Sequence, residues 1–244
     1  GGTHDLATLL RHAIKELGGA HAARFAPMAP ESPAFEATIT ALRSVGWIPF
    51  RFYCFGSWYL DVNCDWKAYL REREGQLRST LKRKGKRFAA EGGTLEIVID
   101  AVDAERGIAD FSQVYARSWK QPEPYPQFIP GLVRWLAETG CLRLGIARLH
   151  GQAIASQIWI VDAGKASIFK LAYDEAHAVY APGTLLTAHL MEHVIDRDRV
   201  HEVDYLIGDD EHKKLWMSHH RERWGIVAYN PASAIGLGML GREV

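Results

Sequence analysis

The chain has 244 residues, 48% hydrophobic and 24% charged, enough for one sizeable globular core or two smaller ones. Its 29 Lys and Arg balance 29 Asp and Glu, so the overall charge predicts neither DNA nor an anionic membrane as a partner. Three cysteines without a CxxC or Cys/His spacing predict a reducing, cytoplasmic location and no zinc site. The sequence has no apolar run of about 18 residues and no visible export signal, so we expect no membrane span. It begins with two glycines instead of methionine, which predicts further sequence upstream.

Residues 1–92 predict a small α/β layer followed by a basic linker helix. We expect a helix from Asp5 to Leu17, ended by Gly18 and Gly19, and then a loop punctuated by prolines. After this loop, the pattern predicts a helix over 35–44 and strands over 47–53 and 58–62 that turn at residues 55–57. A highly charged helix over 65–90 completes this part, with Gly92 and Gly93 after it.

Residues 93–244 predict a denser α/β domain. Two helices in series precede an antiparallel meander of three strands, whose first turn is the His150–Gly151 dipeptide. We expect strands over 94–99, 142–149, 152–161, 165–172, 202–206 and 226–230, and helices over 104–119, 127–138, 182–195 and 211–217.

The start of the helix at 182–195 has the composition of an anion-binding loop. Pro182 suits the first helical turn, Gly183 allows a ligand to approach the backbone closely, and Thr184 offers a hydroxyl. Free backbone N–H groups at a helix N-terminus attract a pyrophosphate or a carboxylate. A Pro-Gly helix start without any ligand is an equally common alternative.

The order of the elements, together with three motifs, resembles the CelD-like (also called BioF-like) acetyltransferase family, relatives of the Fem aminoacyltransferases. The motifs are YDEAHAVYAPGTLL at 173–186, DYLIGDDEHKKLW at 204–216 and RERWGI at 221–226. The resemblance covers about Leu77 to Pro231. It implies a GNAT-like α/β (α+β) fold, a mixed and mostly antiparallel sheet flanked by helices, with residues 1–92 as a partial first GNAT-like lobe and 93–244 as the acyltransferase domain.

The resemblance also implies an acyl donor and a place for it. The donor would be acyl-CoA as co-substrate, held by the loop Tyr180, Pro182, Gly183, Thr184 and Leu185, with no metal. The familiar GNAT loop has Arg or Gln, two residues, Gly, one residue, and then Gly or Ala. Here Leu185 stands where the second small residue is expected, which favours either a modified thioester pocket or an aminoacyl-tRNA donor.

Amine acylation needs a proton acceptor and donors for the oxyanion, which gives roles to residues near the second motif. Asp204, at the end of a strand, is a candidate base or amine anchor, and Tyr173 and Tyr205 are candidate donors. Lys213 and Lys214 resemble the Lys of the Fem-type terminal motif and would neutralise a phosphate or the oxyanion. The alternatives are a structural carboxylate for Asp204 and a solvated helix face for the lysines.

Two more residues are candidates for the acceptor side. Gln157 lies in an apolar strand, where a polar side chain is either hydrogen-bonded or exposed. Trp119 adjoins a Pro-rich loop of the kind that covers binding sites, although ordinary surface packing is equally compatible.

Six cations within residues 78–87 form a basic segment that is either a solvated helix face or a contact for tRNA, acyl carrier protein or a nucleotide-linked sugar. The eleven histidines match no metal-binding pattern. We therefore expect acyl transfer to an amine of a small-molecule or cell-envelope precursor. A Fem-like aminoacyl-tRNA-dependent ligase and a non-catalytic GNAT-like binding module remain alternatives.

Overall fold

The computed structural model describes residues 3–16 and 20–241, so the predicted helix end at Leu17, Gly18 and Gly19 lies outside the described residues. Among the described residues, eight strands are hydrogen-bonded in the order β1-β8-β2-β7-β6-β5-β4-β3. The β6/β7 pairing is parallel, and the other pairings we describe are antiparallel. This confirms the predicted fold class, a mostly antiparallel sheet flanked by helices.

The chain forms two compact units. The first contains Gly1–Ser57, Ile207–Asp209 and His220–Val244, and the second contains Trp58–Leu206 and Asp210–His219. This division differs from the predicted boundary after residue 92. The C-terminal strand β8 pairs with the N-terminal strand β1 in the first unit, and the basic helix belongs to the second unit.

Helices of the first unit pack on a short run of strands. Its elements are α1 (Thr3–Glu16), β1 (Ala22–Met28), α2 (Pro33–Ser44), most of β2 (Ile48–Asp61), nearly all of β8 (His219–Tyr229) and α9 (Ala234–Leu240). Ser32 caps α2. The hydrophobic core of this unit includes Phe35, Leu42 and Ile226.

The predicted turn at residues 55–57 is wrong, because β2 runs straight through it. The glycine in this segment has another purpose. A Cβ on Gly56 would collide with the Asp209 carboxylate, so glycine is needed for close approach of another segment. Strand β1, with Pro27 in it, and helix α9 were not predicted from the sequence.

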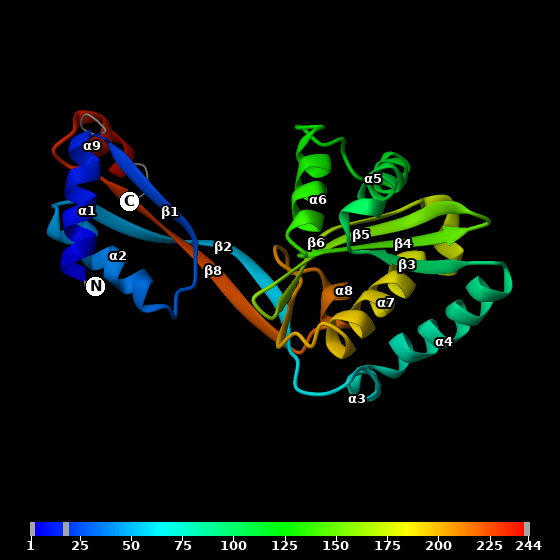
Figure 1. The fold of residues 1–244 in the computed structure, drawn as a ribbon. Coiled ribbons are helices and arrows are strands. Elements are labelled where there is room, and N and C mark those ends of the chain that lie inside the picture. Colours follow the sequence, from blue (N-terminus) through cyan, green and yellow to red (C-terminus); the bar gives the residue numbers. More distant parts are fainter. Residues whose placement is uncertain (1–2, 17–19, 242–244) are drawn as a thin grey trace. The chain divides into compact units, whose positions relative to one another are not determined.

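Helices cover both faces of the sheet in the second unit (Figure 1). The strands are β3 (Thr94–Val98), β4 (Leu142–Leu149), β5 (Gln152–Asp162), β6 (Lys165–Tyr173), β7 (Glu202–Asp204) and the end of β2. One face carries α5 (Ala101–Ala116) and α6 (Phe128–Glu138); the other carries α7 (Pro182–Asp196), with α4 (Gly75–Ala90) and α3 (Trp66–Glu72) packed beside it. The 3-10 helix η1 (Glu175–Tyr180) precedes α7, and α8 (Glu211–Lys214) follows β7.

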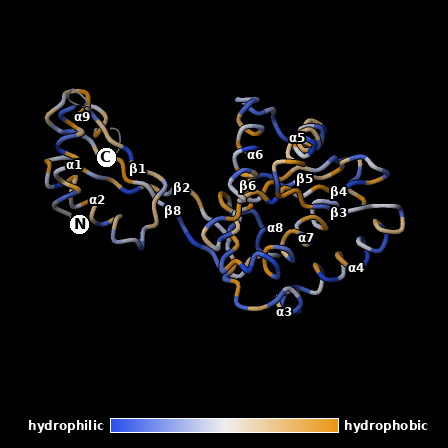
Figure 2. Tube along the Cα trace, viewed as in Figure 1, coloured by the Kyte–Doolittle hydropathy of each residue, from blue (hydrophilic) through white to orange (hydrophobic). Residues whose placement is uncertain are grey.

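Strand β4 is in close contact with both helical layers. A Cβ on Gly107 of α5 would lie 2.5 Å from Leu144, and a Cβ on Gly145 would lie 2.7 Å from Leu190 of α7. Both glycines therefore allow a helix to lie directly on the strand. Figure 2 shows hydrophobic stretches along α7 and along the strands that it covers. This close packing fixes α7, whose first turn belongs to the candidate site.

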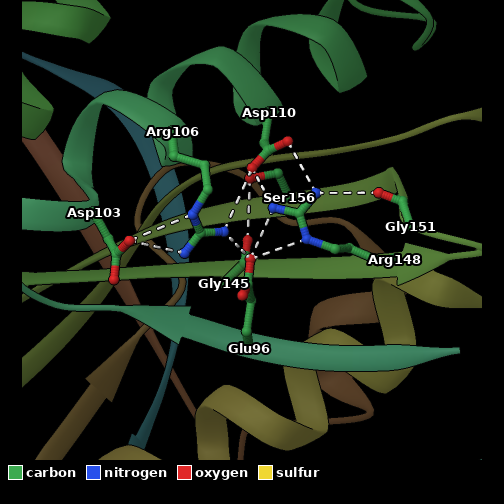
Figure 3. Close-up of polar contacts among 8 residues, drawn as sticks. All are labelled: Glu96, Asp103, Arg106, Asp110, Gly145, Arg148, Gly151 and Ser156. Atoms are coloured by element: carbon green, nitrogen blue, oxygen red, sulfur yellow. Dashed lines mark hydrogen bonds and ion pairs between the residues drawn. The ribbon is translucent and has the colours of Figure 1, made fainter.

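An ion-pair network ties β3 and β4 to α5 (Figure 3). Arg148 donates from Nε and Nη2 to Glu96 at 3.1 and 2.9 Å, and from its two terminal nitrogens to Asp110. Arg106 donates to Glu96 at 2.6 Å and contacts Asp103. Burial raises the pKa of Glu96, but hydrogen bonds from Arg106 and Arg148 outweigh it and lower that pKa below its usual value.

The remaining elements differ from the predictions at their ends. The expected single helix over 65–90 is two helices, because Arg73 adopts an extended conformation between α3 and α4. Strand β8 begins at His219, well before the predicted residue 226. Its first five residues are all polar, so they show no alternation that would predict a strand.

Candidate functional site

Strands β6 and β7 part after a short pairing. Three residue pairs join them, the last being Ser167 with Asp204. Beyond that pair, β6 continues to Tyr173, while the chain leaves β7 through Tyr205 and Leu206, whose φ is +56°. No further residue pair joins the two strands in the described part of the chain, so the sheet opens between these two interior strands.

A cavity of about 280 Å³ lies at this opening. Six residues that the sequence predicts for the site line it together: Trp119, Gln157, Tyr173, Gly183, Thr184 and Tyr205. They come from the loop after α5, from β5 and β6, from the first turn of α7 and from the end of β7. Four lining residues were not predicted: Leu171, Thr187, His212 and Trp216.

The first turn of α7 contributes Gly183 and Thr184 to the lining of this cavity. Ala181, in the left-handed conformation, precedes the helix, and Pro182 begins it. The Leu185 N–H already donates to the Ala181 carbonyl at 3.1 Å. Within the described residues we find no partner for the N–H groups of Gly183 and Thr184, the usual state of a first helical turn. The arrangement suits an anion or a carbonyl oxygen.

The other residues of the predicted loop lie around this turn. Leu185 is buried and packs against α4, where a Cβ on Gly85 would lie 3.7 Å from it. Pro182 is also buried. The Tyr180 hydroxyl bonds to Glu91, which raises the pKa of Tyr180, and the Arg87 guanidinium lies 5.0 Å from the Tyr180 ring. Only Gly183 and Thr184 of this loop line the cavity.

Gln157 connects the sheet to the first turn of α7. It is 1% exposed, and its Nε2 donates to the Gly183 carbonyl at 3.0 Å and to Thr187 Oγ1 at 2.8 Å. Its Oε1 accepts from the buried Trp159 indole at 2.9 Å. The side chain is thus bonded at both ends of its amide, which fixes its orientation and the position of Gly183.

Two titratable side chains at the cavity have shifted pKa values. Burial raises the pKa of Tyr205, and a hydrogen bond with Thr187 acts in the opposite direction. Partial burial lowers the pKa of His212, opposed by Asp210 and assisted by Lys213 and Lys120. At neutral pH, Tyr205 is therefore a hydroxyl donor and His212 is a neutral proton acceptor.

Asp204, Lys213 and Lys214 are not among the lining residues of this cavity. The Asp204 carboxylate accepts from Lys165 Nζ at 2.7 Å and from the Leu206 N–H at 2.8 Å. Lys213 is buried, 3.3 Å from Asp210 and 5.5 Å from the Tyr205 ring centre, whereas Lys214 is exposed and lines a separate hollow beside α8. Their predicted catalytic and binding roles stay predictions.

Sequence signals existed for two of the unpredicted lining residues. Thr187 follows Gly183 by four positions, so helical periodicity places it on the same face. His212 directly precedes the predicted Lys213, so it lies in the same motif as the predicted site residues. In the described part of the chain no cluster of three or more possible metal ligands occurs, and no helix there is long and apolar enough to cross a bilayer.

Comparisons with known proteins agree on one fold. A family model described as an acetyltransferase (GNAT) domain matches residues 75–214. FemX has a similar structure, with a TM-score of 0.67 and 13% identity over 98% of this chain and 79% of FemX. The C-terminal domain of a putative lysylphosphatidylglycerol synthetase from Agrobacterium fabrum has a TM-score of 0.60 and 15% identity over 98% and 78% of the two chains.

A third structure, L-PGS from Bacillus licheniformis, has a TM-score of 0.61 and 14% identity over 96% of this chain and 74% of its own. At these identities the similarity shows a shared fold. No functionally curated protein matches the sequence.

Proposed function

The chain belongs to the acetyltransferase (GNAT) domain family, and on that premise we propose that it moves an acyl group from a thioester donor to an amine. The donor of this proposal is acyl-CoA or an acyl carrier protein. The acceptor is a small-molecule, nucleotide-linked or cell-envelope precursor. The CelD-like branch of the family, related to the Fem enzymes, fits the motifs best. Three free cysteines support a reducing location such as the cytoplasm.

One observation carries the proposal: the cavity at the parted strands combines an anion-binding helix start with a proton acceptor and hydroxyl donors. The residues fit a thioester donor, because Gly183 and Thr184 offer N–H groups while Leu171 and Trp216 supply apolar walls. The unusual Leu185 does not obstruct this fit, since its side chain is buried against α4.

In this proposal the amine nitrogen attacks the thioester carbonyl carbon, the C–S bond breaks, and the thiolate leaves with the electron pair. Neutral His212 takes the proton that the nitrogen loses, and the thiolate gains a proton from Tyr173 or from water. Tyr205, held as a donor by its raised pKa, stabilises the developing oxyanion. Asp204 holds the backbone on both sides of Tyr205 by accepting a hydrogen bond from the Leu206 N–H.

The test is release of free thiol from acyl-CoA in the presence of a panel of amines, compared between two variants at Gly183. A Cβ there would lie 3.5 Å from Tyr173, an ordinary contact, so Gly183→Ala should keep the donor KM within about threefold. Gly183→Val adds a branched side chain with two more methyl groups than alanine beside the N–H groups, and it should raise the donor KM about tenfold or more. Both variants should unfold within a few degrees of the wild type. A folded valine variant with wild-type donor affinity would refute donor binding at this turn.

A second candidate, transfer from aminoacyl-tRNA, is favoured by the position of the basic helix α4. Lys84 donates to the Val179 carbonyl at 2.6 Å and Gly85 lies against Leu185, so α4 borders the first turn of α7. Four exposed cations of α4 make no ion pair within the described part of the chain: Arg78, Lys82, Arg83 and Lys86. Transfer from aminoacyl-tRNA but not from acyl-CoA, with a steep loss at high salt, would select this candidate. Binding of donors without any transfer would leave a non-catalytic binding module.

A further inference from the structure

A second cavity of about 380 Å³ lies between α5, α6 and the loop that joins them. Phe111 and Ile129, 2% and 4% exposed, form its floor. Ala116, Pro122 and Pro126 line its walls. The cavity is mostly apolar and within the size range of small-molecule sites, so it can hold an aromatic or branched aliphatic group.

Charged residues border the cavity unevenly. Glu123 accepts hydrogen bonds from the Tyr115 hydroxyl at 2.6 Å and from Lys170. Hydrogen bonds from Lys170 and Tyr115 lower the pKa of Glu123, so this carboxylate is ionised and already neutralised. Lys120 also lines the cavity, which leaves one positive charge in excess among Lys120, Lys170 and Glu123. The excess favours a ligand that carries an acidic group.

Lys120 also lies beside a residue that lines the first cavity. Its ammonium lies 5.2 Å from the ring centre of Trp119, and the Trp119 ring lies 4.9 Å from that of Tyr173; both aromatic residues line the first cavity. Lys120 is close enough to His212 to contribute to the lowered pKa of that histidine. A ligand held at Lys120 would therefore lie beside Trp119, which lines the proposed transfer site.

We propose that the acceptor amine carries an apolar substituent that occupies the second cavity and an acidic group that pairs with Lys120. An α-amino acid with an aromatic or large aliphatic side chain has this arrangement. Its amino group then reaches the first cavity, where the nitrogen replaces the thiol on the acyl carbon and gives an N-acyl amino acid and a free thiol. This inference rests on the proposed function for the transfer step, but not for the binding site.

The experiment measures binding and transfer separately with three probes on the whole chain. L-phenylalanine has the apolar group and the carboxylate, phenethylamine lacks the carboxylate, and glycine lacks the apolar group. By calorimetry, L-phenylalanine should bind at least about tenfold more tightly than either partial probe. With acetyl-CoA as donor, its kcat/KM should exceed theirs by a similar factor.

Two variants test the place of binding. Ala116→Trp puts an indole at the exposed edge of the cavity and should abolish L-phenylalanine binding, whereas Ala109→Trp, on an exposed part of the same helix outside the cavity lining, should not. Lys120→Gln should weaken L-phenylalanine binding severalfold and leave phenethylamine binding unchanged.

Equal binding of all three probes, no binding of L-phenylalanine, or full binding by a folded Ala116→Trp variant would overturn the assignment. Binding with the expected variant effects, but no transfer from any donor, would support the site and refute the proposed function.

Discussion

Replacing Gln157 tests whether one buried amide both stabilises the fold and positions the donor-binding turn. Gln157→Met keeps a long unbranched side chain but removes both polar ends of the amide. Trp159, fully buried, loses the acceptor for its indole N–H. Gly183 loses the donor from Nε2, although its carbonyl still accepts from Thr187 Oγ1 at 3.0 Å.

The magnitude follows from which groups lose every partner. A buried donor left without an acceptor costs about 1–3 kcal/mol, and the Trp159 indole is the main one created here. We expect the free energy of unfolding, from urea titration, to fall by about this amount. In a Trp159→Phe background the indole N–H is already absent. Gln157→Met should therefore cost at least about 1 kcal/mol less there than in the wild type, and this difference is the coupling energy of a double-mutant cycle.

The donor KM separates the two roles of Gln157. Gln157→Met should raise it about three- to tenfold, because the Gly183 carbonyl is no longer held by the sheet. Trp159→Phe, which keeps the bonds to Gly183 and Thr187, should leave the donor KM within about twofold. Zero coupling energy in the cycle would refute the hydrogen-bond argument, and an unchanged donor KM in a folded Gln157→Met variant would refute the positioning argument.

Three other predictions concern the ion network, the catalytic residues and the basic helix. Arg148→Met should lower the free energy of unfolding by about 1–3 kcal/mol, because it leaves two partly buried carboxylates with weakened partners. The folded pKa of Glu96 is depressed, so the stability that its ionised carboxylate contributes is present above the ordinary Glu pKa of about 4.3 and is lost as the pH falls through the folded pKa. In acid titrations, the difference in unfolding free energy between Arg148→Met and the wild type should therefore shrink below about pH 4. His212→Gln should lower kcat about a hundredfold and remove the acidic limb of the pH profile of kcat. Asp204→Asn should have this effect only if the Asp204 carboxylate accepts the proton; otherwise it should lower the melting temperature, because the ion pair with Lys165 is lost. Changing three exposed cations of α4, Arg78, Lys82 and Lys86, to Gln should leave the melting temperature within a few degrees, because exposed substitutions cost little. The triple variant should bind a polyanion more weakly and with a shallower salt dependence, and loss of cooperative unfolding would contradict a partner role for these residues.

The site residues that could be predicted have local signals. Pro182 and Gly183 mark a helix start whatever the tertiary structure does, and Gln157 interrupts an apolar strand, so a bonded or exposed amide followed directly. The structure makes the amide bonded and buried, with Gly183 as one partner. The sequence does not contain that pairing, because it joins residues 26 positions apart.

Asp204 shows what strand geometry adds to a motif. Successive residues of a strand point to opposite faces, so Asp204 and Tyr205 are not expected to line one cavity from a regular strand. Tyr205 lines the cavity and Asp204 bonds to Lys165. Applied to the sequence, the same alternation would have separated the two roles.

The first unit was harder to predict because its order depends on distant pairing. The prolines around residue 27 suggest a loop, but Phe25 pairs with Ile226 in strand β8. Gly56 and its neighbours are typical of a turn, yet Gly56 lies in a continuous strand, where the missing side chain leaves room for Asp209. In both places the local pattern is ambiguous, and a partner about 150 to 200 residues away decides the structure.

Packing also indicates which parts of the site are free to differ between related chains. Helix α7 is fixed along its length, by Gly145 against Leu190 on the sheet and by Gln157 at its first turn. Such a turn presents its N–H groups without reorganisation, which suits a part of the donor that all reactions share. The loop after α5 is tied to β6 by the pair of Glu123 with Lys170. It borders both cavities, because Trp119 lines the first and Lys120 lines the second. Acceptor choice can therefore change with this loop while the donor turn stays the same.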